Sequence, residues 1–155
     1  MKKLPPIEKI YEAYSAVADN RVMMPTPEEG LLLGETGEAI VRSSDGSRSY
    51  TVTWHDDTYT SNDRASYWQG YPGYPVIAVL MLQGRLPLDM EVARKFVGIN
   101  WKSLNTAAHN DYAAVVDDVI RERGYDRAPL DAIVQEVYSR LEALPIMMRR
   151  GAMRP

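Results

Sequence analysis

Apolar residues recur at intervals of three and four near the start of the chain. After Pro5-Pro6 they stand at Ile7, Ile10, Tyr11, Tyr14 and Val17. This spacing predicts an amphipathic α-helix that ends near Asp19-Asn20. The following residues, 21 to 36, contain several prolines and glycines and predict an irregular connection.

An Asp-Gly turn lies between two strand-like runs farther along the chain. Residues 38–43 and 48–55 flank Ser44-Asp45-Gly46-Ser47, which predicts a β-hairpin. In the second run, Tyr50, Val52 and Trp54 alternate with polar residues, so one face should meet the core and the other should be polar. Thr58-Tyr59-Thr60 is the candidate for a third strand.

The second half of the chain has helical patterns. The apolar run 76–82 lies between Pro75 and Gly84 and suits a short buried helix, although its β-branched residues leave a buried strand open. Further helices are expected at 89–97, at 106–123 with Asn105 as its cap, and at 129–144. The last ten residues, 146–155, predict a flexible, partly ordered tail.

These elements predict one α+β domain over residues 1–155. A small antiparallel sheet, with its hairpin at about 38–55 and a third strand near 58–60, packs against the N-terminal helix and a helical C-terminal half. The length of 155 residues and the 45% hydrophobic content are sufficient for one core.

Composition excludes several kinds of chemistry. The chain has no Cys, so disulfides, thiolate catalysis, iron–sulfur clusters and Cys-based zinc sites are excluded. Its 18 Lys and Arg against 21 Asp and Glu give a formal charge of -3, which favours neither nucleic acid nor an anionic membrane. Because no apolar stretch is long enough for a membrane span or a signal peptide, we expect a cytoplasmic protein without membrane contacts.

A polar cluster stands at the end of the second hairpin strand. His55 and Asp57 share one face of an extended chain and are candidate ligands for a divalent metal, since imidazole and carboxylate groups suit such ions. Asp56, Asp63 and His109 are the candidate catalytic residues that would move protons on a metal-activated water. The alternative is a solvated strand end where Asp favours the turn.

Aromatic residues gather in a Gly- and Pro-rich segment that we expect to be a loop. Tyr67, Trp68, Tyr71 and Tyr74 carry rigid rings that can line a ligand pocket or contact a protein partner. The alternative is that they cover the edge of the core. Self-association, or a protein or small-molecule ligand, is therefore the expected mode of interaction.

Residues 91–105 loosely resemble a helix-turn-helix, but the helix expected to follow begins with few base-reading groups and is acidic at Asp117-Asp118. We therefore do not expect nucleic-acid binding. The chain also has no G-x-S-x-G, P-loop or G-x-G-x-x-G motif.

Two functional hypotheses follow from the sequence. The first is a non-catalytic binding or assembly domain, in which the aromatic loop is the contact or ligand surface. The second is a metal-assisted hydrolase at His55 and Asp57, with a divalent metal as cofactor. Convergence of His55, Asp57 and His109 in space would favour the enzyme, whereas an exposed apolar patch around Trp68 and Tyr71 would favour assembly.

Overall fold

The fold is a mixed α and β structure built around one sheet. The computed structural model describes residues 2–25, 36–151 and 154–155. Within this part of the chain the sheet has five strands in sequence order, with β1 to β4 antiparallel and β5 parallel to β4. The strands are β1 (Val22–Met23), β2 (Thr36–Arg42), β3 (Ser49–His55), β4 (Thr58–Ser61) and β5 (Met147–Met148).

Helices make up most of the remaining described residues. In chain order they are α1 (Lys9–Ala18), the single-turn π-helix η2 (Ala65–Gln69), α2 (Tyr74–Leu82), α3 (Met90–Arg94), α4 (Trp101–Ala107), α5 (Tyr112–Arg123) and α6 (Arg127–Ala143). None of them combines the length and the hydrophobicity that crossing a bilayer requires.

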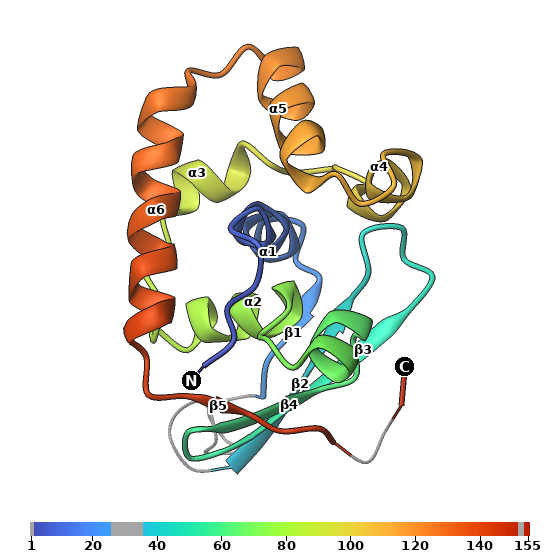
Figure 1. Cartoon of the computed structure of the whole chain (residues 1–155), viewed down its shortest axis with the longest axis vertical. Coiled ribbons are helices and arrows are strands. Elements are labelled where there is room, and N and C mark those ends of the chain that lie inside the picture. The colour runs from blue at the N-terminus through green and yellow to red at the C-terminus, as the bar shows by residue number, and fades with distance from the viewer. Residues whose placement is uncertain (1, 26–35, 152–153) are drawn as a thin grey trace.

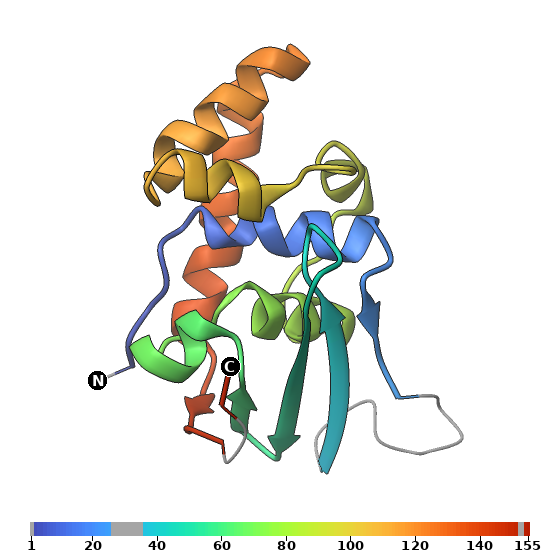
Figure 2. The same cartoon turned by 90° about the vertical axis from the view of Figure 1, so that its right-hand side faces the viewer.

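The elements form successive layers, with α2 between the sheet and α1 (Figures 1 and 2). Helix α2 contacts β1, β3 and β4 on one side and α1 on the other. Its residues 75–81 are all buried, which explains why this segment is apolar all round. Helix α1 is enclosed in turn by α2, α3 and α6, and every residue from 9 to 17 is buried.

The predicted hairpin is confirmed. Strands β2 and β3 pair in a continuous register from Thr36 opposite His55 to Arg42 opposite Ser49. Val52 and Trp54 are buried, while Thr51 and Thr53 are half-buried on the other face. The third strand is also confirmed as β4. The sheet is larger than predicted because β1 and β5 add two further strands.

The predicted helix at 106–123 is wrong, because the chain breaks there into α4 and α5. His109 and Asn110 have φ values of 52° and 63°, in the left-handed region that ends a right-handed helix. The side chain of Asp111 then caps α5 by accepting a hydrogen bond from the Ala114 amide at 3.2 Å. Asn105, predicted as the cap, is instead buried inside α4.

The run at 76–82 is confirmed as a buried helix, the first of the two predicted alternatives. Other segments refine the prediction. The segment from Tyr67, expected to be a loop, begins within the π-helix η2. The predicted helix at 89–97 is shorter, ending at Arg94. The connection at 21–36 and the tail at 146–155 each contribute two residues to the sheet, as β1 and β5. Residues 26–35 of that connection lie outside the described residues.

The left-handed residues between α4 and α5 make a testable contribution to stability. Replacing His109 with Val places a β-branched residue at a φ of 52° and should cost about 1–2 kcal/mol of unfolding free energy. The control Ala107→Val, in the last turn of α4, should cost only about 0.5 kcal/mol through helix propensity. Urea denaturation measures both, and equal losses would contradict the strained connection.

Candidate functional site

A polar cavity of about 260 Å³ lies where α1, α4, the start of α5, the tip of the β2–β3 hairpin and the segment around η2 meet. Its wall combines charged, hydroxyl, amide and aromatic groups from four separated parts of the chain. The lining residues are Lys9, Glu12, Arg21, Ser43, Ser44, Tyr50, Asp63, Arg64, Ala65, Tyr74, Trp101, Lys102, Asn105, Thr106, Asn110 and Tyr112. Arg64, Lys102 and Thr106 are exposed and mark its opening to solvent.

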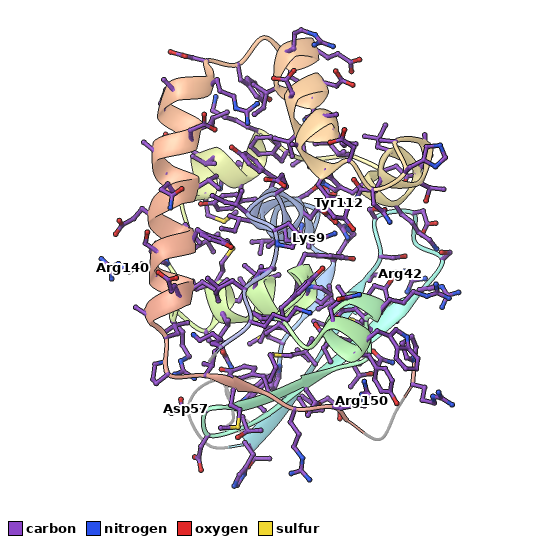
Figure 3. All side chains as sticks on the ribbon, in the orientation of Figure 1. Lys9, Arg42, Asp57, Tyr112, Arg140 and Arg150 are labelled. Carbon is purple, nitrogen blue, oxygen red and sulfur yellow. The ribbon has the colours of Figure 1, made fainter. Side chains whose placement is uncertain are left out.

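A buried ion pair forms one side of the cavity. Lys9 and Glu12 stand three residues apart on α1, with Nζ 3.1 Å from Oε2, and their exposed fractions are only 7% and 5%. The Lys9 ammonium also lies 3.9 Å from the centre of the Tyr112 ring, a cation–π contact that joins α1 to α5 (Figure 3).

Burial and pairing act in opposite directions on this pair. Burial raises the pKa of the Glu12 carboxyl, more than the neighbouring Lys9 lowers it. For Lys9, burial favours the neutral amine and is the largest single effect, but Glu12, Tyr112 and Tyr71 together outweigh it, and the pKa of Lys9 is raised. Each charge therefore depends on its partner, and the removal of one leaves the other buried without compensation.

Arg21 lies at the junction between α1 and the sheet. Its backbone carbonyl accepts a hydrogen bond from the Arg42 amide at 2.8 Å, and its Nη1 donates to the Arg42 carbonyl at 2.8 Å. These two bonds hold the guanidinium beside the cavity. Nε is 3.6 Å from the nearest carboxylate oxygen of Asp19, too long for a hydrogen bond. Nε and Nη2 are both buried without a hydrogen-bond partner among the described residues.

Two residues of α4 add further unpaired groups to the wall. The indole Nε1 of Trp101 and the amide oxygen of Asn105 are buried and accept or donate no hydrogen bond within the described part of the chain. The amide nitrogen of Asn105 donates to Glu12 at 3.4 Å. Buried polar groups are nearly always hydrogen-bonded, so these atoms of the wall have hydrogen-bonding capacity that the described residues do not use.

The hairpin tip closes the cavity against α4. Ser44 Oγ accepts a hydrogen bond from the Lys102 amide at 3.0 Å, and Lys102 Nζ donates to Ser47 at 3.1 Å. Asp45 organises the tip by accepting hydrogen bonds from the amide and hydroxyl of Ser47 at 3.0 and 2.7 Å. These bonds, with one from the Ser43 hydroxyl, lower the pKa of Asp45 well below its usual range.

Asp63 has a structural position at the base of the cavity. Its Oδ2 accepts a hydrogen bond from the Ser66 amide at 3.0 Å, and its Oδ1 accepts one from the Ser61 hydroxyl. Ser66 Oγ in turn accepts a hydrogen bond from the Gly73 amide at 2.9 Å. A Cβ on residue 73 would stand 2.3 Å from Oδ2, so glycine is needed for this close approach. The carboxylate is thus occupied in holding η2 and the start of α2.

The predicted metal ligands lie elsewhere. The His55 side chain is 77% exposed and 3.7 Å from Asp56, and Asp57 pairs with Arg85 at 2.7 Å. Figure 3 shows Asp57 at the far edge of the sheet from Lys9 and Tyr112. His109 is in the α4–α5 connection. Across the residues described, no group of three His, Asp or Glu side chains is arranged to hold a metal ion.

The aromatic residues of the predicted contact surface separate into different environments. Tyr67 and Tyr71 are buried, and Tyr74 is half-buried in the cavity wall, where burial raises the pKa of its phenol. Trp68 is the exposed member, at 49%. The guanidinium groups of Arg150 and Arg154 lie over its ring at 5.3 and 5.4 Å. Of the candidate site residues predicted from the sequence, only Tyr74 and Asp63 line the cavity.

Sequence reasoning missed Lys9, Glu12 and Arg21 because it gave α1 a solvent-facing side. One signal was available: no charged residue occurs between Ala13 and Ala18. A helix with no charged residue over its second half has no charged, solvent-facing side there. The charged residues in its first half could therefore have been expected to be buried as well.

Fold and cavity together describe an α+β protein with a partly enclosed cavity lined by charged, amide and aromatic residues. A family model described as "Uncharacterised conserved protein UCP014422" matches residues 2–147, and the chain belongs to this family. No curated protein and no solved structure matches the chain.

The Lys9–Glu12 pair makes a prediction about stability and pH. Lys9→Met should lower the unfolding free energy at neutral pH by about 3–5 kcal/mol, because the Glu12 carboxylate loses its buried partner. Since burial raises the pKa of Glu12 above its unfolded value, the folded variant binds the proton more tightly. Its stability should therefore rise as pH falls through the folded pKa.

Denaturant titrations across the acidic and neutral range measure this dependence. The double variant Lys9→Met, Glu12→Leu is the control, since it removes both charges and should lose less stability than the single variant at neutral pH. A Lys9→Met variant with no recovery at low pH, together with a double variant that is no more stable, would contradict the coupling.

Proposed function

We propose that this protein binds a small polar molecule in the cavity between α1, α4 and the β2–β3 hairpin. The observation that carries the proposal is the set of buried, unpartnered polar atoms in its wall: Arg21 Nε and Nη2, Trp101 Nε1 and Asn105 Oδ1. A ligand that hydrogen-bonds these atoms removes the penalty of leaving them unpaired, which is about 1–3 kcal/mol each.

The size of the cavity supports a metabolite-sized ligand. Its volume of about 260 Å³ is below the roughly 300–1,000 Å³ of sites for drug-sized molecules. Tyr50, Tyr74 and Trp101 supply flat apolar surface beside the polar groups, a combination typical of small-molecule sites. The cavity thus replaces the aromatic loop as the ligand surface, and Tyr74 belongs to both.

Thermal unfolding in the presence of a panel of small polar metabolites tests the proposal. A ligand at a hundred times its Kd stabilises the folded state by about 2.7 kcal/mol. For a chain of this length that free energy raises Tm by roughly 5–10 °C.

Matched variants on α4 locate the site. Thr106→Phe places a large side chain at the opening of the cavity and should abolish the rise in Tm. Ser103→Phe, also exposed on α4 but outside the cavity wall, should keep the rise. The proposal fails if no member of the panel stabilises the wild type, or if the Thr106→Phe variant responds as the wild type does.

A further inference from the structure

The charges in the cavity wall define the chemistry of the ligand, given the binding function proposed above. The wall contains four cations, Lys9, Arg21, Arg64 and Lys102, and two carboxylates, Glu12 and Asp63. Glu12 is paired with Lys9, and the oxygens of Asp63 accept hydrogen bonds from Ser61 and Ser66. Arg21 lies 3.6 Å from Asp19 and Lys102 lies 3.5 Å from Asp45, so these cations also have carboxylate neighbours, but two N–H groups of Arg21 make no hydrogen bond within the described part of the chain.

Arg21 is the largely buried cation of the wall whose N–H groups are not all hydrogen-bonded within the described part of the chain. Its side chain is only 10% exposed, and two of its nitrogens have no hydrogen-bond partner among the described residues. Adjacent N–H groups of a guanidinium form a planar fork that matches two oxygens of a carboxylate or phosphate. Arg64 is exposed and Lys102 partly exposed at the opening, where they attract an entering anion.

Asn105 presents an acceptor to the same cavity. Its NH₂ group faces Glu12, because an amide oxygen would be repelled by the carboxylate. This contact fixes the orientation of the amide and leaves Oδ1 as the unpartnered atom. The complementary ligand group is a hydrogen-bond donor such as a hydroxyl or an amine.

We infer that the ligand is a small organic anion that carries both a carboxylate or phosphate group and a hydroxyl or amino group. Arg21 binds the anionic oxygens, Trp101 donates a further hydrogen bond through Nε1, and Asn105 accepts one from the hydroxyl or amino group. Both anionic groups present the oxygens that the guanidinium requires.

Binding calorimetry on the wild type separates the anionic group from the rest of the ligand. The probes are two matched pairs at millimolar concentration: ribose 5-phosphate with ribose, and gluconate with glucose. We expect an anion to bind and its neutral counterpart not to bind. The anion that binds more tightly shows whether the site prefers a phosphate or a carboxylate group. Equal binding of both members of each pair, or no binding by either anion, overturns the inference.

Variants assign the anion to Arg21 and Arg64. Arg21→Gln should lower the affinity for the anion by about 10- to 100-fold, as expected for the loss of a charge-assisted hydrogen bond. Arg64→Gln, at the exposed opening, should lower the affinity for the anion by a few-fold and is not expected to affect folding. Arg94→Gln, an exposed arginine of α3 outside the cavity wall, is the control and should bind as the wild type does.

The outcomes distinguish this inference from the proposed function. If metabolites stabilise the wild type but not Thr106→Phe, while neutral probes bind as well as anions, the cavity is a binding site and the anion inference is wrong. An anion can also bind to the wild type, to Arg64→Gln and to Arg94→Gln with equal affinity. In that case, thermal unfolding of Arg21→Gln with and without the anion tests whether Arg21 binds it. A full ligand-induced rise in Tm in that variant overturns the role of Arg21.

Discussion

The structure depends on the burial of α2, a helix with no polar face. A helix that is apolar all round must be covered on all sides, and the sheet and α1 provide the two largest surfaces. Burying α2 in this way places α1 in a second layer, where it also loses contact with solvent. The charged residues of α1 are then buried as a consequence of the packing of its neighbour. The polar cavity lies where α1 meets the hairpin tip, the segment around η2, α4 and the start of α5.

Local sequence signals predicted the elements that local chemistry controls. The Asp-Gly turn and the alternation of Tyr50, Val52 and Trp54 were sufficient for the hairpin, because turn geometry and side-chain periodicity act over a few residues. The same holds for the start of α3 at Asp89, whose side chain accepts hydrogen bonds from the amides of Glu91 and Val92.

Long-range packing controlled the features that the sequence did not reveal. Asn105 was predicted as a helix cap because its side chain suits that position, yet Asn100 caps the helix, and Asn105 lies inside α4, where it donates a hydrogen bond to Glu12, 93 residues away. The two-residue strands β1 and β5 exist only through pairing with β2 and β4. The cavity could not be predicted because its wall comes from four separated segments. His55 and Asp57 formed a plausible local motif, but nothing in the fold brings a further ligand to them within the described residues.

The contact between the hairpin tip and α4 has a consequence for local opening. Helix α4 has only seven residues, too few to persist alone, and its first amides are satisfied by Asn100 from its own segment and by Ser44 from the hairpin. These hydrogen bonds couple the tip to the helix, although 55 to 58 residues separate the contacting groups. Amide hydrogens in both segments should consequently exchange with solvent at linked rates. Because the cavity lies between these two segments, loss of their contact would widen its opening to solvent.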